Sequence, residues 1–426
     1  MADFDDYQWL AADSEAERFL EAHWGDERSE LQQLNELRKR LSPARARLIV
    51  ELLSLRRRGA EKFGPLAAKL FFTPLQLEQA TDRDIAAYKA HRMGCAAGGR
   101  AVHDFCCGIG GDLLALAATG QAVGWELDPV VSLLAERNLH VAVEMALLSE
   151  SATSVEQADV AEATLSAGDA WHVDPDRRAG GRRSTTLEHH SPPPEIVNRW
   201  RRAAPTGAVK LAPGSDIPPD WQDAGELEWI SRRRECRQLV IWFGESATAP
   251  GQRRATTVSS QRSDDPRLGM EGVRASSFCG LPDEAAPSAN APQRFVYEPD
   301  PAVVAARLAG AMANQYGLAT LGAGSVYLTG EEVADDALLT RFEVLETMPL
   351  STKDVARWLA ARGVGRIEIK KRGVSVDPER FRRDLRLRGD DEATVILTRI
   401  GQRQLAIIAR RHQSLEEAAG QGRSPS

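Results

Sequence analysis

The chain contains 426 residues, carries a formal net charge of −7, and is 42% hydrophobic and 27% charged. This length exceeds one ordinary domain, so we expect two or more domains, each with a core of its own. No apolar run approaches the roughly 18 residues of a membrane-spanning helix, and the acidic start lacks the features of a secretory signal. These properties favour a cytoplasmic protein without a membrane partner.

The cysteines indicate reduced thiols rather than a disulfide framework. Five are present, which is an odd number, and two of them, Cys106 and Cys107, are adjacent. Such usage is typical of a reducing compartment. The sequence contains no CxxC pair or His/Cys cluster, so no metal site is predicted.

Charge is distributed unevenly along the chain. Between Arg362 and Arg411 there are fourteen Arg and Lys against seven Asp and Glu, a balance of about +7 that leaves about −14 for the remainder. The C-terminal part is therefore the basic part.

The first part of the chain is predicted to be helical. Apolar residues recur at helical spacing from about Ala16 to Met93, so residues 1–95 are assigned to a helical N-terminal region. Short apolar runs then alternate with helical stretches, which predicts a Rossmann-like α/β domain over residues 96–294 with a doubly wound, mostly parallel sheet. The expected strands are AVHDFC, AVGWEL, AWHVDP, GAVKLAPG and RQLVIWFG, and the clearest helices are 112–118 and 129–139.

The remainder of the chain is divided by composition. Residues 245–293 are rich in Ser, Ala, Pro, Arg and Gly and predict a flexible insertion, with RRATTV as an edge strand. A small segment is expected over 295–343 and a small α+β module over 344–413, with helices at 351–362 and 377–385 and strands RIEIKKRG, ATVILTRI and RQLAIIARR. A disordered tail is expected over 414–426.

A glycine loop follows the first predicted strand. HDFCCGIGGD places Asp104 at the strand end, ahead of Gly108, Gly110 and Gly111 and of a helix that starts at about Asp112. Glycines let the backbone approach a ligand, and a helix N-terminus offers free N–H groups, so the loop suits a nucleotide-like cofactor. The second strand ends at Glu126, where a carboxylate can accept hydrogen bonds from both hydroxyls of a ribose.

The spacing favours S-adenosylmethionine (SAM) over NAD. A dinucleotide fold usually shows GxGxxG, whereas here the spacing is GxGG and Asp104 precedes the loop, well placed for the methionine amino group of SAM. DFCCGIGGD followed by GWELDP resembles motifs I and II of class I SAM-dependent methyltransferases, and DxxCGxGG is similar to trimethylguanosine synthase-like and related RNA-modifying members. The resemblance implies that Asp159 contacts the adenine amino group. Cys106 lies in the cofactor loop, where a small side chain fits against the backbone and the ligand, and it is counted among the cofactor-binding residues.

The acceptor end of the predicted sheet is less regular. The fourth strand continues into DPDRRAGGRRS, and Asp174 and Arg177 are the candidate catalytic residues. Methyltransferases acting on exocyclic amines usually have an aromatic residue at the fourth position of this motif, and here Arg177 occupies it. DPDRRAGG is also similar to the motif of uracil-C5 RNA methyltransferases, but the cysteine that they need is absent from GAVKLAPG. Neither Cys106 nor Cys107 is expected to be a nucleophile.

Three further stretches extend the resemblance over nearly the whole chain. DRDIAAYKAHRM, YEPDPAVV and MPLSTKDVARWLAARGVGRIEIKKRGVSVDPERFRRDL are similar to a bacterial family of class I methyltransferases with a ferredoxin-like segment and a C-terminal THUMP-like domain. THUMP-type modules imply RNA modification, and no DNA specificity is evident. The local positive charge that phosphate binding needs is predicted to come from Lys370, Lys371, Arg372, Arg382 and Arg383.

Three functions are therefore compared. The leading hypothesis is methyl transfer from SAM to an RNA nucleotide, which the basic C-terminal module positions. The second keeps SAM but gives it a small-molecule or protein acceptor. The third is a catalytically inactive RNA-binding adaptor, which the unusual DPDRR motif keeps open.

Overall fold

The computed structural model describes residues 2–150, 153–176, 187–260, 265–322 and 325–412. The chain forms two compact units. One contains Met1–Leu227, Gln238–Gly251 and Val258–Ala275, and the other contains Glu228–Arg237, Gln252–Thr257 and Ser276–Ser426. The predicted helical N-terminal region, residues 1–95, lies in the same unit as the first strands of the α/β sheet.

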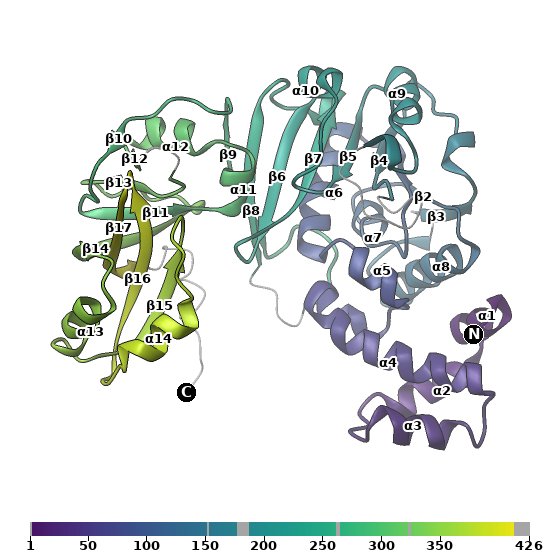
Figure 1. Cartoon of the computed structure of the whole chain (residues 1–426). Coiled ribbons are helices and arrows are strands. Elements are labelled where there is room, and N and C mark those ends of the chain that lie inside the picture. The colour runs from purple at the N-terminus through teal and green to yellow at the C-terminus, as the bar shows by residue number, and fades with distance from the viewer. Residues whose placement is uncertain (1, 151–152, 177–186, 261–264, 323–324, 413–426) are drawn as a thin grey trace. The chain divides into compact units, whose positions relative to one another are not determined.

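The N-terminal region is helical, as predicted, and is coloured purple in Figure 1. Its helices are α1 (Phe4–Ala12), α2 (Ser14–His23), α3 (Glu30–Leu37), α4 (Pro43–Phe63), α5 (Pro74–Gln79) and α6 (Arg83–Ala97), with a 3-10 turn at Gly64–Ala68. Most of these helices are capped at the N-terminus by a side-chain oxygen. Thr73, for example, accepts from the N–H of Gln76 at the start of α5. Across the described part of the chain, no helix is both long enough and apolar enough to cross a membrane.

The first sheet has nine strands in the order β3-β2-β1-β4-β5-β7-β6-β8-β9. Their bounds are β1 (Val102–Phe105), β2 (Ala122–Glu126), β3 (Thr153–Gln157), β4 (Ala170–Val173), β5 (Gly207–Leu211), β6 (Glu226–Arg232), β7 (Glu235–Phe243), β8 (Arg253–Ser260) and β9 (Val273–Gly280). Strands β1 to β5 pair in parallel and β7 pairs antiparallel with β5. This is the Rossmann-like doubly wound sheet that the sequence predicts.

Helices connect the parallel strands of this sheet. They are α7 (Leu113–Ala117), α8 (Pro129–Glu144), α9 (Pro194–Ala203) and α10 (Pro219–Ala224), with 3-10 turns η3 (Val160–Glu162), η4 (Leu187–His189) and η5 (Gly244–Ser246). Asp128 caps α8 by accepting from the N–H groups of Val130 and Val131, and Pro129 fills the first helical position. The strand order reverses between β1 and β4, which is where open α/β sheets bind ligands.

The second sheet has eight strands in the order β10-β12-β13-β11-β14-β17-β16-β15. They are β10 (Ser288–Ala289), β11 (Phe295–Pro299), β12 (Ala319–Leu321), β13 (Leu328–Gly330), β14 (Leu339–Pro349), β15 (Val364–Lys371), β16 (Asp391–Ile400) and β17 (Arg403–His412). The helices of this part are α11 (Pro301–Ala305), α12 (Ala309–Tyr316), α13 (Thr352–Ala360) and α14 (Pro378–Leu385).

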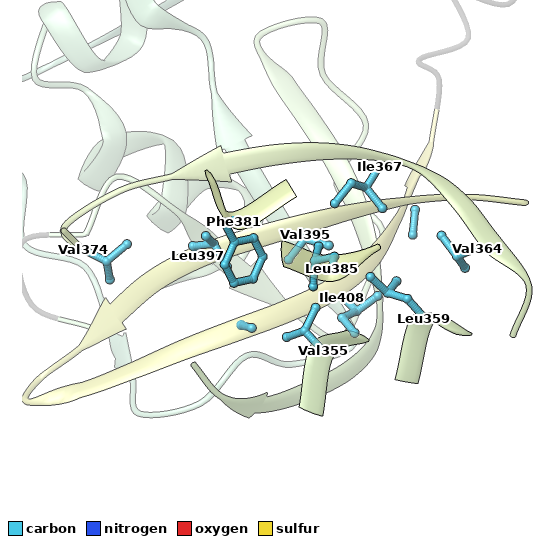
Figure 2. Close-up of a cluster of buried hydrophobic side chains, with 12 residues drawn as sticks. Val355, Leu359, Val364, Ile367, Val374, Phe381, Leu385, Val395, Leu397 and Ile408 are labelled. Atoms are coloured by element: carbon cyan, nitrogen blue, oxygen red, sulfur yellow. The ribbon is translucent and has the colours of Figure 1, made fainter. Parts of the chain in front are cut away.

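Alternating side chains give the C-terminal sheet two buried faces. On one face, Val395 and Leu397 of β16 pack with Val355 of α13 and Phe381 of α14, as Figure 2 shows. On the other face, Ile396 packs with residues of β11, β12 and β14. Because successive strand residues point to opposite faces, the continuous apolar run of β16 buries both.

The structure differs from the predicted layout in three places. Residues 245–293, predicted as a flexible insertion, contain β8 and β9, and β8 lies between β6 and β9 rather than at the edge. Strand β6 was not predicted, because its acidic residues Glu226 and Glu228 broke the apolar run although both are fully buried. The boundary predicted at residue 343 falls inside β14, which pairs with both β11 and β17.

Candidate functional site

The loop between β1 and α7 is shaped by its glycines. Gly108 and Gly110 have φ values of 55° and 87°, in the left-handed region that glycine adopts without strain. A Cβ on Gly108 would lie 2.7 Å from Oε1 of Gln76, so the end of that flexible side chain would have to move. Gly111 precedes the helix and approaches the backbone of Thr81, with 3.3 Å between its ideal Cβ and that N atom. The positive φ angles at Gly108 and Gly110 are conformations that glycine adopts without strain, and the approach of this backbone to a cofactor stays a prediction.

Glu126, at the end of β2, is brought to this loop. Its Oε2 accepts from the N–H of Gly108 at 3.0 Å and its Oε1 accepts from the N–H of Asp128 at 3.0 Å. Burial raises the pKa of the Glu126 carboxyl, and these backbone donors oppose the rise. A carboxylate has about four acceptor positions, and the N–H of Leu127 also acts on this one, so acceptor capacity remains for a further hydroxyl. The predicted ribose contact is compatible with this geometry.

Asp104 lies at the end of β1 and is only 1% exposed. Its Oδ1 lies 2.7 Å from Nδ1 of His172, the residue opposite it in the β1–β4 register. Its Oδ2 is buried and has no hydrogen-bond partner among the described residues. Burial raises the pKa of this carboxyl, and His172 opposes the rise. An unsatisfied buried carboxylate oxygen is costly, and the ammonium of a methionine moiety would satisfy it.

A buried lysine that the sequence analysis did not single out joins this cluster. Lys89 of α6 is 2% exposed, and its Nζ lies 2.8 Å from Oδ1 of Asp112 and 3.2 Å from Nε2 of His172. Thr81 donates to the other oxygen of Asp112 at 2.7 Å. Burial alone would raise the pKa of Asp112, but Lys89 and neighbouring cations hold it well below its usual range. Lys89 and Asp112 therefore form a charged pair beneath the loop.

The acceptor end contains a second charged pair. Asp174 follows β4, and its N–H donates to the carbonyl of Phe105 at 3.3 Å, so it lies beside the end of β1. Its Oδ2 lies 2.5 Å from Nζ of Lys210 on β5. Burial would lower the pKa of Lys210, but Asp174 and Asp112 raise it above the usual value. The raised pKa favours the protonated form of Lys210 beside Asp174. Arg177, predicted beside Asp174, lies outside the described residues, as do Arg178, Arg182 and Arg183.

The two loop cysteines behave as packed thiols. Cys106 has a φ of 57°, and its Sγ lies 3.9 Å from the carbonyl oxygen of Ser191. Burial raises the pKa of both Cys106 and Cys107 well above that of a free thiol, and neighbouring carboxylates add to the effect. Because the thiolate is the nucleophilic form, this setting disfavours covalent catalysis by either residue.

Asp159 follows β3, at the position that the sequence analysis assigns to it. It caps the 3-10 turn η3, where its Oδ1 accepts from the N–H of Ala161 at 2.8 Å. Its predicted contact with an adenine amino group stays a prediction. Among the described residues, no group of three or more His, Cys, Asp or Glu could hold a metal ion.

The five predicted RNA-binding residues differ in how they are engaged. Lys370 is 17% exposed and pairs with Glu298 at 2.8 Å and Glu368 at 3.1 Å. Arg382 donates to the carbonyl of Ile367 at 2.7 Å, which ties α14 to β15. Lys371, by contrast, is exposed and donates to the carbonyl of Val376 at 3.0 Å.

Arg372 and Arg383 are the two most available of the five. Both side chains are exposed, and within the described part of the chain neither forms a salt bridge. Arg386 and Arg388 are exposed nearby in sequence and are likewise unpaired among the described residues. A local excess of positive charge therefore faces solvent at the end of β15 and along α14.

A Rossmann-like methyltransferase is defined by four features together. These are the strand order, the glycine loop after β1, the acidic residue at the end of β2 and the unsatisfied buried carboxylate. A protein from Porphyromonas gingivalis described as a candidate methyltransferase has the same fold, with a TM-score of 0.71 and 19% identity, covering 97% of this chain and 100% of that one. The family model of the THUMP domain-like family matches residues 339–411.

Sequence relatives identify the family. Proteins from two strains of Mycobacterium tuberculosis, described as uncharacterized S-adenosylmethionine-dependent methyltransferases, are 33% identical to this chain over 383 residues, covering 85% of this chain and 96% of each relative. The chain belongs to the SAM-dependent methyltransferase family. It is accordingly an enzyme that uses SAM as its cofactor.

Proposed function

We propose that this enzyme transfers the methyl group of SAM to a nucleotide of RNA. The observation that carries the proposal is the exposed positive charge of Arg372 and Arg383 in a region that matches the THUMP domain-like family. Unpaired cations at a protein surface attract a polyphosphate chain, whereas a small acceptor would not need them. In this proposal the C-terminal module binds the RNA and the first sheet performs the transfer.

The cofactor is held, in this proposal, by residues at the switch point of the first sheet. Asp104 binds the methionine ammonium through its free Oδ2, Glu126 binds the ribose hydroxyls and Asp159 contacts the adenine. The backbone around the cofactor is supplied by Cys106, Gly108, Gly110 and Gly111. SAM supplies a methyl group that its positively charged sulfur already activates. The protein's contribution is then mainly to align the acceptor and to exclude water.

Asp174 is the proposed contact with the acceptor. Its Oδ2 lies 2.5 Å from Nζ of Lys210, and a carboxylate that pairs with an ammonium only accepts hydrogen bonds, so Asp174 suits an acceptor atom that carries a hydrogen, such as a nitrogen or a hydroxyl oxygen. A carbon acceptor would need a covalent nucleophile, and the raised pKa of Cys106 disfavours one. Arg177 stays a proposed neighbour of the acceptor.

Label transfer tests the acceptor class. The full chain is incubated with SAM carrying a labelled methyl group, unmodified bulk RNA and, separately, a protein and small-metabolite extract freed of nucleic acid. We expect label in RNA and expect ribonuclease to release it. Label that enters only protein or small metabolites would contradict the RNA proposal while leaving the methyltransferase intact. Tight RNA binding without any transfer would indicate an inactive adaptor.

A further inference from the structure

Four polar side chains form a continuous buried chain beneath the cofactor loop. Asp104, Asp112, Lys89 and His172 are 1%, 8%, 2% and 3% exposed. They come from different parts of the fold: β1, the residue before α7, α6 and β4. None of the four was assigned a role in methyl transfer except Asp104. A buried set of this kind costs free energy unless every member is satisfied, so we expect it to have a specific use.

The positions of the protons in these four side chains follow from Lys89. Burial lowers the pKa of Lys89, and the carboxylate of Asp112 opposes the fall. As an ammonium, Lys89 only donates, and its Nζ is 3.2 Å from Nε2 of His172, so Nε2 accepts. A neutral imidazole then carries its proton on Nδ1, which donates to Oδ1 of Asp104 at 2.7 Å. Asp112, at 2.8 Å from Lys89, compensates the lysine's charge. Oδ1 of Asp104 is therefore engaged by His172, and Oδ2 has no hydrogen-bond partner among the described residues.

We propose that Lys89 and His172 are positioning residues for the cofactor, which orient Asp104 and keep its second oxygen available for the methionine ammonium of SAM. The proposal rests on the assignment of Asp104 to the cofactor. It makes α6, part of the predicted helical N-terminal region, a component of the cofactor site. Without Lys89, Nε2 of His172 would lose its donor, and the ring would no longer be held in one orientation against Asp104.

Two substitutions of His172 separate positioning from packing. His172→Asn keeps an amide donor near the place of Nδ1, whereas His172→Leu removes every donor, and both lose the contact with Lys89. We expect the dissociation constant of SAM, measured by calorimetry, to rise about tenfold or more in the Leu variant and much less in the Asn variant. Equal affinities in two folded variants would overturn the proposal.

The tautomer of His172 gives a second readout. Long-range proton–nitrogen spectra of histidine-labelled protein, with the His172 signal assigned from its absence in His172→Asn, should show a neutral ring protonated on Nδ1 in the unsubstituted chain. Lys89→Met should change that signature and weaken SAM binding about tenfold or more. An Nε2-protonated ring in the unsubstituted protein would contradict the proposed hydrogen-bond direction.

Lys62→Met is the matched control for lost stability. Lys62 is another lysine of the N-terminal helices, and its ammonium donates to the carbonyls of Leu77, Glu78 and Ala80 rather than to His172. We expect it to lower the melting temperature without changing the His172 signature. Failure of the unsubstituted chain to bind SAM would refute the cofactor site itself, whereas SAM binding without RNA methylation would leave this inference intact.

Discussion

Charged side chains are used differently in the two units of the chain. Around the cofactor loop of the first unit, Lys89, Asp104 and Asp112 are buried and held within 2.7 to 2.8 Å of a partner. In the C-terminal module of the second unit, Arg372 and Arg383 are exposed and have no salt-bridge partner among the described residues. The first arrangement fixes a geometry, whereas the second presents positive charge to solvent.

This difference predicts how each region should respond to experiment. Buried charge pairs are little screened by salt, and removing one partner costs several kcal/mol because the other charge stays buried without compensation. They therefore suit a single small ligand of fixed shape. Exposed cations act through their summed field, are strongly screened and tolerate single substitutions, so they suit an extended polyanion. Substitutions can therefore affect transfer, cofactor affinity or RNA affinity separately.

The largest effect is expected at the acceptor end. Asp174→Asn keeps the shape of the side chain and an oxygen that can accept a hydrogen bond, but it removes the negative charge that pairs with Lys210 and that could take the acceptor's proton. We expect the rate of methyl transfer at saturating SAM to fall on the order of a hundred- to a thousandfold, as for loss of a positioned proton acceptor, with SAM affinity nearly unchanged. Single-turnover transfer and calorimetry measure the two quantities. Asp223→Asn, an exposed residue of α10, is the control, and an equal loss of rate there would remove Asp174 from the acceptor site.

The next effect concerns the buried carboxylate of the cofactor loop. Asp104→Asn can still accept from His172 but no longer offers a charged oxygen to the methionine ammonium. We expect the dissociation constant of SAM to rise about a hundredfold, which is about 3 kcal/mol and within the range for a buried charged hydrogen bond. Calorimetry provides the measurement, with Glu156→Gln on the exposed surface of β3 as the control. Unchanged affinity in a folded Asp104→Asn protein would mean that SAM is held elsewhere.

Local patterns in the sequence predict the frame of the site. Alternating apolar runs and helices give the sheet, the DFCCGIGGD stretch gives the loop, and Glu126 follows at the end of β2. Such features are encoded within about thirty residues, as in other nucleotide-binding βαβ units. They could therefore be predicted from one sequence, and the structure confirms the sheet and the glycine conformations.

Charged pairs between distant segments could not be predicted in the same way. Lys89 lies 83 residues before His172, and Asp104 lies 68 residues before it. Lys370 contributes to the charge of the basic stretch, yet Glu298, 72 residues earlier, neutralises it. The only local signal was a titratable residue inside an apolar strand, as with His172 in AWHV and Lys210 in GAVKL. A strand buried on both faces tolerates such a residue only if a partner faces it. The sequence of the strand does not reveal which distant residue that partner is.

The smallest effect is expected in the C-terminal module and depends on salt. Arg372→Glu combined with Arg383→Glu should weaken RNA binding about tenfold at low salt and flatten the dependence of log affinity on log salt by roughly 1.5, because two phosphate contacts are lost. Filter binding or anisotropy with a labelled RNA across a salt series measures both, and SAM affinity should stay unchanged. Arg38→Glu with Arg58→Glu makes the same change in net charge on exposed positions at the end of α3 and in α4. If this control flattens the salt dependence equally, the RNA attraction comes from overall charge, and the C-terminal module has no special part in it. If only the Arg372 and Arg383 pair does so, the exposed charge and the buried charge serve separate ligands.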